Sequence, residues 1–243
     1  MGNLVIACAT KYDSSPLGNV KAGIAKRTLA VGKNLGYDFV IVDGGSPERL
    51  LVEFRELGAE VYNQSSSGMG NGKREVIGKA LEKGCETIVL TELEKLSLID
   101  ELAELVKFME DVNAGVVIPK RMNLDSYPLE QQLVEKFGNL FWERVTGRDD
   151  DVWFGPRVFR REHARYFLDY QSRTEDLWDS IFCPLMDMIH DDVKIESFVV
   201  NYVHPSEQSR LEKDDLVTLE KRVRQITNLT IPLREYWDLR MKK

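Results

Sequence analysis

Over its first 120 residues the chain alternates short apolar runs with longer segments of helical periodicity. The runs that predict buried strands are 4–9, 39–42, 59–62, 87–90 and 115–118, and the segments that predict helices are 20–35, the residues after Pro47, 73–83 and 96–109. A repeated strand–helix order produces a mostly parallel sheet with helices on both faces. We therefore expect an α/β fold with three layers, α/β/α.

The second half of the chain keeps its apolar patterns but loses this regular alternation. It predicts helices at 129–147, 177–189 and 211–226, a helical tail from Pro232, a strand or turn at 152–161, and a strand at 195–203. The apolar residues that mark the helix at 129–147 are Leu129, Leu133, Phe137, Leu140, Phe141 and Val145. No linker or repeat interrupts the sequence, so we expect a single domain, 1–243, in which residues 121–243 complete a site that residues 1–120 begin.

Composition argues against several classes of protein. Lys and Arg number 33 against 40 Asp and Glu, a net charge of −7, which does not favour general binding to a nucleic-acid backbone. No apolar run approaches the ~18 residues that a transmembrane segment needs. The three cysteines, Cys8, Cys85 and Cys183, form no CxxC pair and predict a reduced, cytoplasmic protein.

Polar and glycine-containing segments follow the predicted strands, at the end of a parallel sheet where ligands bind. Thr10 and Tyr12 follow the first strand, and Asp43 with two glycines follows the second. An acidic side chain at such a turn can accept hydrogen bonds from a nucleobase or a ribose. A plain turn is the alternative interpretation.

Residues 68–74 read Gly-Met-Gly-Asn-Gly-Lys-Arg, directly before and into a predicted helix. Backbone N–H groups at a helix start favour anions, and glycines such as Gly70 leave them accessible. Arg74 can grip a phosphate with two hydrogen bonds, and Lys73 can add a point charge. The segment lacks the spacing of a P-loop. It predicts a phosphate site, with a flexible surface loop as the alternative.

An acidic pair, Glu92 and Glu94, comes directly after the fourth predicted strand. The two side chains share a face if the strand conformation continues. Carboxylates and substrate phosphates are typical ligands of Mg²⁺. His204, which follows the last predicted strand, can complete such a metal site. Acidic residues are also common at helix starts, where they offset the helix dipole, and this is the alternative.

Three carboxylates, Glu175, Asp176 and Asp179, surround a predicted helix start. One of them can act as a general base toward a hydroxyl group, and helix capping is the alternative. No GxSxG or HExxH motif and no kinase signature set is present.

The order of these segments resembles a glycosyltransferase of the GT-A type, the nucleotide-diphospho-sugar transferase fold, over roughly residues 3–205. The family 2 and mannosylglycerate-synthase-like groups are the nearest in pattern. The resemblance implies that 1–120 form a nucleotide-binding half and 121–243 an acceptor half with C-terminal helices. The residues it implies are Thr10, Tyr12, Asp43, Gly70, Lys73 and Arg74 for the nucleotide, Glu92, Glu94 and His204 for a metal, Gly155 and Arg157 for the acceptor, and Asp176, Glu175 or Asp179 as catalytic base.

The activity implied by this resemblance is transfer of a sugar from a nucleoside-diphosphate sugar to a hydroxyl of a small-molecule or lipid-linked acceptor, assisted by Mg²⁺ or Mn²⁺. We expect a hexosyltransferase, with mannosyl transfer as one option and a homo-oligomer as one possible state. The chain departs from the family where Glu92 and Glu94 replace an Asp-x-Asp pair, and Lys95 adds a positive charge beside them. Two alternatives stay open: a catalytically inactive GT-A-like protein that binds a nucleotide or a partner, and a sugar nucleotidyltransferase.

Overall fold

The computed structural model describes residues 3–213 and 215–242. Its strands are β1 (Leu4–Thr10), β2 (Asp38–Asp43), β3 (Glu60–Asn63), β4 (Thr87–Leu90), β5 (Val116–Arg121), β6 (Arg157–Arg160) and β7 (Ile195–Val200). They form one seven-stranded sheet in the order β3-β2-β1-β4-β6-β5-β7. The five strands predicted in the first half are all present, with ends that differ from the prediction by at most three residues.

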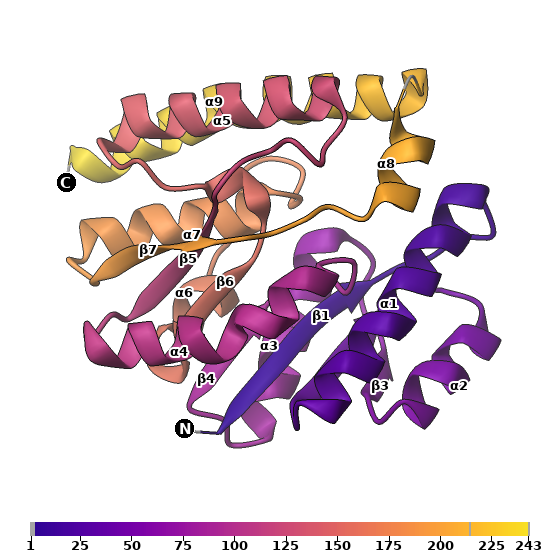
Figure 1. Cartoon of the computed structure of the whole chain (residues 1–243). Helices are drawn as coiled ribbons and strands as arrows, with labels where there is room; N and C mark the ends of the chain where they lie inside the picture. The colour runs from indigo at the N-terminus through magenta and orange to yellow at the C-terminus, as the bar shows by residue number, and fades with distance from the viewer. Residues whose placement is uncertain (1–2, 214, 243) are drawn as a thin grey trace.

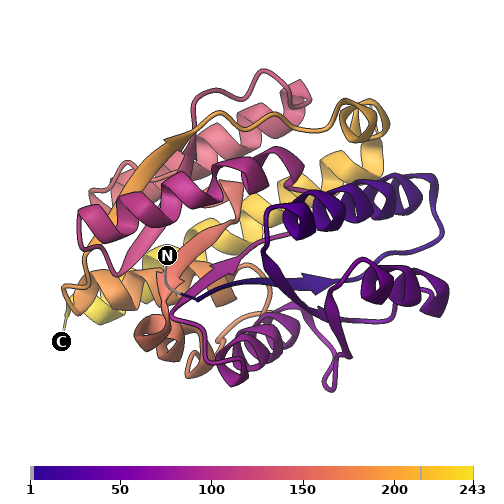
Figure 2. The same ribbon diagram turned by 60° about the horizontal axis from the view of Figure 1, so that its bottom comes forward.

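Helices cover both faces of this sheet (Figure 1). The α-helices are α1 (Pro16–Asn34), α2 (Glu48–Glu56), α3 (Met69–Glu82), α4 (Leu102–Asp111), α5 (Leu129–Thr146), α6 (Ala164–Leu168), α7 (Asp179–His190), α8 (Ser206–Glu212) and α9 (Leu216–Met241), and short 3₁₀ helices are η1 (Leu96–Glu101), η2 (Val152–Phe154) and η3 (Arg161–His163). One core cluster packs α1, α2, η1 and α4 on one face, and a second packs α3, α5, α6, α7 and α9 on the other. The predicted three-layer α/β/α fold is therefore confirmed (Figure 2).

Strand β1 shows why the sheet is buried on both faces. Val5 and Ala7 point into one core cluster, whereas Ile6 and Cys8 point into the other, and none of the four is exposed. Side chains alternate between the faces of a strand, so a central parallel strand reads as a continuous apolar run. This is the pattern from which the strand was predicted.

Strand β6 is antiparallel to both of its neighbours, whereas every other pairing in the sheet is parallel. Val158 lies opposite Val89 of β4 on one side and Val117 of β5 on the other. Because its direction is reversed, β6 begins beside the C-terminal ends of the parallel strands. The loop before Arg157 therefore faces the loops that follow β1, β2 and β4.

Two helices differ from the sequence-based expectation. Helix α3 begins at Met69, so the glycine-containing segment forms its first turn and not a loop before it. The segment predicted as one helix at 211–226 instead spans the end of α8 and the first part of α9. Helix α9 then continues through Pro232, which was expected to begin a separate tail.

Helix α5 packs through a face that its apolar pattern does not indicate. Leu129, Leu133, Phe137 and Leu140 are all about half exposed or more. The buried residues are instead Gln131, Glu135, Gly138 and Trp142. Gly138 is needed there because a Cβ atom at this position would lie 2.0 Å from the Trp153 ring.

The charged member of this buried face, Glu135, pairs with a buried arginine. Arg121, at the end of β5, forms ion pairs with Glu135 of α5 and with Asp151, directly before η2. Its Nε and Nη2 atoms each donate to Asp151 at 2.7 Å. Although burial opposes ionisation of Asp151, the Arg121 guanidinium holds the pKa of that carboxyl below its usual value. A single cation thus joins the sheet, α5 and the chain leading into β6.

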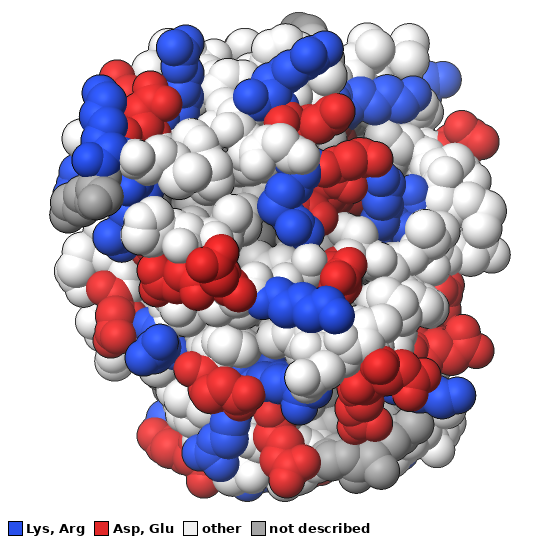
Figure 3. All heavy atoms as spheres, turned by 90° about the vertical axis from the view of Figure 1, so that its left-hand side faces the viewer, with Lys and Arg blue, Asp and Glu red and all other residues white. Residues whose placement is uncertain are grey.

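Charges on the surface are mixed in sign. Figure 3 shows Lys and Arg side chains interspersed with Asp and Glu side chains over the face it presents. Among the described helices, none combines the length and apolar content needed to cross a membrane.

Replacing Arg121 with Ala should lower the free energy of unfolding by about 3–5 kcal/mol, because two buried carboxylates lose their common partner. Urea unfolding followed by circular dichroism measures this difference. Lys120→Ala is the matched control, since Lys120 pairs with a largely exposed Asp149 and its loss should cost about 1 kcal/mol or less. Equal losses for the two variants would contradict the role given to Arg121.

Candidate functional site

The ends of β1 and β2 are joined by the carboxylate of Asp43. Its Oδ2 atom accepts hydrogen bonds from the hydroxyls of Thr10 at 2.7 Å and Ser46 at 2.6 Å. Its Oδ1 atom accepts from the backbone N–H groups of Gly45 at 2.9 Å and Ser46 at 2.6 Å. A buried carboxylate is costly unless it is hydrogen-bonded, and four donors satisfy this one. Asp43 therefore fixes the turn whose backbone borders the adjacent pocket.

This pocket has a volume of about 810 Å³ and lies between the ends of β1, β2 and β3 and the start of α3. Its walls include Thr10, Lys11, Asp43, Gly44, Gly45, Ser46, Asn63, Gln64, Gly68, Gly72 and Lys221. A second pocket of about 590 Å³ is lined by Lys11, Tyr12, Lys21 and Lys221. Tyr12 is 4% exposed and packs its ring edge-to-face on Phe54, and burial raises the pKa of its hydroxyl.

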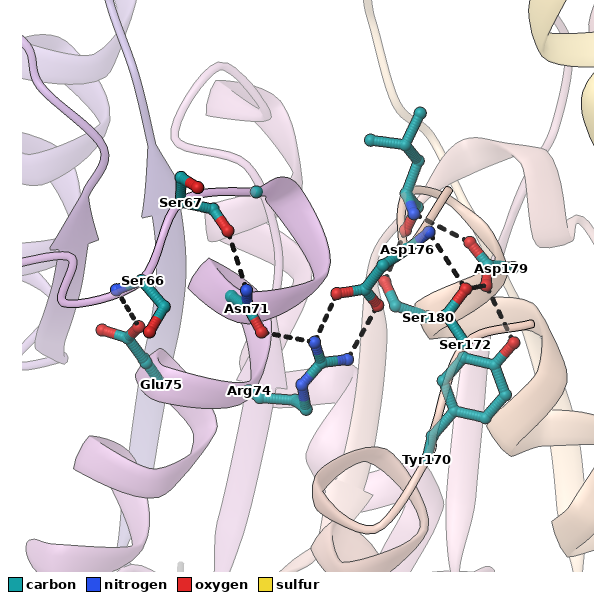
Figure 4. A network of polar contacts seen from close by, with 12 residues as sticks. Ser66, Ser67, Asn71, Arg74, Glu75, Tyr170, Ser172, Asp176, Asp179 and Ser180 are labelled. Carbon is teal, nitrogen blue, oxygen red and sulfur yellow. Dashed lines mark hydrogen bonds and ion pairs between the residues drawn. The ribbon is translucent and has the colours of Figure 1, made fainter. Parts of the chain in front are cut away.

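The start of α3 meets the segment before α7, and Figure 4 shows the contact. Arg74 donates from both terminal nitrogens to the two carboxylate oxygens of Asp176, with Nη1 at 2.9 Å from Oδ1, and also donates to Asn71 at 2.6 Å. The backbone N–H of Gly70 donates to the carbonyl of Asp176 at 2.9 Å. A Cβ atom on Gly70 would lie 2.1 Å from Asp176 Oδ1, so a larger residue here would displace the Asp176 carboxylate. The expected phosphate-binding arginine and one expected base are thus bound to each other.

The other two carboxylates of this segment have different surroundings. Asp179 is 3% exposed and accepts hydrogen bonds from Tyr170 at 2.8 Å, Ser172 at 2.6 Å and the backbone N–H of Leu177 at 2.8 Å (Figure 4). Glu175 is exposed and accepts one hydrogen bond, from Asn228 of α9 at 3.3 Å. Both border a pocket of about 500 Å³ between this segment and the first half of α9.

The acidic pair after β4 lies among positively charged groups. Glu92 packs against Gly155, where a Cβ atom would be 3.0 Å from its Oε1 atom, and its Oε2 atom is buried without a hydrogen-bond partner. Burial lowers the pKa of Lys73 to about 8, against the opposing attraction of Glu92. The Nζ atom of Lys73 has no hydrogen-bond partner and lies 4.6 Å from the centre of the Trp178 ring.

The second acid, Glu94, is half-buried. Burial raises its pKa, and the nearby Lys21 opposes this shift. The ammonium group of Lys95 lies 4.7 Å from the centre of the Phe154 ring. Burial disfavours the charged form of Lys95, but Tyr127 and Glu92 act together to hold its pKa above the usual value.

His204 does not join this pair. Its Nε2 atom lies 3.3 Å from Glu212 of α8, and its ring stacks on Tyr127 with ring centres 4.3 Å apart. Burial lowers the pKa of its imidazole, against the effect of Glu212. Within residues 3–213 and 215–242, no three His, Cys, Asp or Glu side chains are grouped so that they could hold a metal ion. The expected set of Glu92, Glu94 and His204 is therefore not assembled as a metal site.

Arg157 lies deeper than an acceptor-binding residue would be expected to lie. It is fully buried and donates to the carbonyls of Pro156 at 2.8 Å and Val152 at 2.7 Å. Burial lowers its pKa to about 10. Gly155, with φ of 104°, turns the chain into β6 against Glu92. Contact of either residue with an acceptor remains a prediction.

Sequence reasoning did not single out Lys21 and Lys221. Lys221 borders three pockets, the one beside Asp43, the one beside Tyr12 and the one beside Glu175. In the sequence it is one of many charged residues in an amphipathic helix. Only the packing of α9 across the site distinguishes it.

Comparison with known proteins identifies the fold. No family model and no curated protein matches the chain. Glucosyl-3-phosphoglycerate synthase from Mycobacterium tuberculosis, in complex with phosphoglyceric acid, superposes with a TM-score of 0.68 at 11% identity over 96% of this chain and 80% of that chain. The same enzyme in complex with Mn²⁺, UDP and glucosyl-3-phosphoglycerate gives 0.64 at 10% identity, with the same coverage of 96% and 80%.

A proposed nucleotide-diphospho-sugar transferase from Desulfovibrio desulfuricans also matches, with a TM-score of 0.50 at 14% identity over 97% of this chain and 99% of that chain. With its strand order and reversed β6, the chain has the GT-A fold. At sequence identities this low, the superpositions establish the fold alone, and the chemistry has to be argued from the site.

Replacing Asp43 with Asn should lower the free energy of unfolding by about 1–3 kcal/mol, because an amide nitrogen cannot accept the hydrogen bonds that the turn donates. Guanidinium unfolding measures the loss. Asp38→Asn, at the exposed start of the same strand, is the control and should be nearly neutral. An unchanged stability of Asp43→Asn would show that the turn does not depend on this carboxylate.

Proposed function

We propose that the chain is a glycosyltransferase that moves a sugar from a nucleoside-diphosphate sugar to a hydroxyl acceptor. The observation that carries this proposal is a pair of adjoining pockets beside the C-terminal ends of the parallel strands. One is bordered by the Asp43 turn and the other by Glu175, and Lys221 belongs to both. Ligands of open α/β sheets bind at this edge. A solved structure of the same fold holds UDP and a sugar-bearing product, which supports the proposal.

The donor would occupy the pocket beside Asp43. There Thr10 and Asp43 shape the turn, and the backbone of Gly44 and Gly45 would contact the base and ribose. The diphosphate would face the cationic side of the pocket, which includes Lys11 and Lys221. Arg74 would act indirectly, because its guanidinium holds Asp176.

The acceptor would occupy the pocket beside Glu175. In an inverting reaction the acceptor oxygen attacks the anomeric carbon of the donor sugar. The bond from that carbon to the diphosphate breaks, its electron pair leaves with the nucleoside diphosphate, and the hydroxyl proton passes to a carboxylate. Glu175 is the best placed of the three candidates, because Asp176 and Asp179 are occupied by strong donors. We predict that the sugar is a hexose, with mannose as one option, and that the acceptor is a small molecule or is lipid-linked. A homo-oligomeric state and a cytoplasmic location also stay predictions.

Thermal unfolding with UDP, GDP, CDP, ADP and their common sugars tests the donor class. A ligand at 100 times its Kd stabilises a protein by about 2.7 kcal/mol, which raises Tm measurably. We expect one nucleotide to raise Tm and its sugar conjugate to release the diphosphate when an acceptor is added. No rise with any of them would favour the non-catalytic alternative.

Glu175→Gln should lower kcat by about 10²–10⁴-fold, because the amide cannot take the acceptor proton. The affinity for the nucleoside diphosphate should stay the same, since Glu175 does not border the donor pocket. Steady-state kinetics of diphosphate release measure the first quantity and calorimetry the second. Asp169→Asn, an exposed carboxylate nearby in sequence, is the control. A large loss in Asp176→Asn with none in Glu175→Gln would move the base to Asp176.

A further inference from the structure

We propose that two copies of the chain associate through the outward face of α5, with the two helices antiparallel about a twofold axis. This inference does not rest on the proposed transfer reaction. It starts from the inverted pattern of α5, in which Gln131 and Glu135 are buried and large apolar side chains face outward.

The outward face of α5 carries a continuous stripe of four apolar side chains. They are Leu129, Leu133, Phe137 and Leu140, and their exposed fractions are 64%, 59%, 53% and 48%. At 3.6 residues per turn, the four positions lie within about 80° of the helix circumference, opposite the buried residues. A surface helix normally turns such a stripe toward the core. A stripe that faces outward instead is typical of a surface that contacts another molecule.

The packing of α5 within the chain does not use this stripe. The helix contacts α9 and the core through other side chains, those of Val134, Phe141, Trp142 and Val145. In Figure 1 it forms the upper edge of the molecule beside α9, with no other described element drawn above it. Its 18 residues give a face about 27 Å long. A second molecule can therefore cover the stripe without displacing any part of the described fold.

Four charged side chains flank the stripe, and they alternate in sign along α5. They are Glu130, Lys136, Glu143 and Arg144. Glu130 is half-buried and the other three are exposed. Within residues 3–213 and 215–242, none of the four forms an ion pair. Each of these charges is therefore available to a partner molecule.

An antiparallel pair of α5 helices places opposite charges against each other. When the twofold axis passes through the middle of the stripe, Lys136 lies within one turn of the partner subunit's Glu143 on one flank. On the other flank, Glu130 lies within one turn of the partner subunit's Arg144. Symmetry repeats both contacts. If the helices ran parallel and in register, Lys136 and the partner subunit's Glu143 would be seven residues, or about 10 Å, apart along the axis.

The same arrangement covers the apolar residues. Phe137 and Leu140 of each copy meet near the axis, so the burial of apolar surface, the main favourable term in association, adds to the pairing of charges. A contact formed by one helix of each copy is smaller than a standard interface of about 1,600 Å² in total. We therefore expect the dimer to have a micromolar Kd.

A second copy fits this face better than a lipid surface does. Two acidic and two basic side chains flank the stripe, and the whole chain has a net charge of −7. Helices that lie on anionic bilayers instead carry mostly Lys and Arg on their polar face. A face whose charges complement those of its own copy is the pattern expected of an interface between two identical subunits.

Sedimentation velocity of the full chain over about 1–500 μM tests the association, because a micromolar dimer forms across this range. Phe137→Ser should raise the Kd of the dimer by about tenfold or more, since each dimer loses two buried rings. The matched control is Val52→Ser on α2, where the natural side chain is 43% exposed. It should leave the Kd unchanged. Circular dichroism verifies that both variants fold as the natural chain does.

Reversal of single charges tests the antiparallel arrangement. Lys136→Glu and Glu143→Lys should each raise the Kd of the dimer by about tenfold, because like charges then meet twice in every dimer. An equal mixture of the two variants should associate as the natural chain does, since each contact again joins opposite charges. Lys107→Glu, at an exposed position of α4, makes the same change in net charge as Lys136→Glu and should have no effect.

Several outcomes would overturn the proposal. A chain that stays monomeric at the highest concentration has no such interface, and a dimer that is unchanged by Phe137→Ser uses another surface. If the mixed charge variants do not recover association, the antiparallel arrangement is wrong. Flotation with phosphatidylglycerol vesicles is the last measurement. A monomer that binds these vesicles, and loses binding in Phe137→Ser, would assign the stripe to a lipid surface instead.

Discussion

The arrangement of the second half of the molecule depends on the ion pairs that the guanidinium group of Arg121 forms. It is buried with two carboxylates, one on α5 and one directly before η2. Buried charges of this kind are tolerated only when each has its partner. Because η2 leads directly to Gly155, and Gly155 packs against Glu92, the same ion pairs fix where the acidic pair meets the rest of the site. Ion pairs among residues that border none of the candidate pockets therefore help to set the position of Glu92.

The central strands could be predicted because a strand that is buried on both faces has a short continuous apolar run in its sequence. The packing face of α5 could not, because its buried positions include Gln131 and Glu135 while several leucines stay exposed. A glutamate becomes a core residue only when a buried cation meets it, and Arg121 is distant in sequence. The pairing of Arg74 with Asp176 was hidden for the same reason: both residues were recognised as polar and functional, but nothing local indicates that two groups 102 positions apart neutralise each other.

Many of the carboxylates expected to contact ligands serve the protein itself. Asp43 holds a turn, Asp176 holds α3, and Asp179 holds the segment before α7. A rigid frame of this kind allows neighbouring backbone and exposed side chains to face a ligand without reorganising. Residue type thus singled out these side chains, whereas which of them hold the protein together depended on their three-dimensional neighbours. The GT-A fold alone does not determine that division.

The reversed strand β6 has a consequence for how the molecule forms. Strands β1 to β4 can pair as soon as they are synthesised, but β4 meets β5 only through β6, which comes later in the chain. Until then the edge of β4 is an open row of backbone donors and acceptors, a state prone to pairing with other chains. Insertion of β6 closes this edge and brings Gly155 against Glu92 in one step. Closure of the β4 edge and the contact between Gly155 and Glu92 are therefore coupled, so a ligand that recognises this contact would distinguish chains in which β6 has inserted from chains in which it has not.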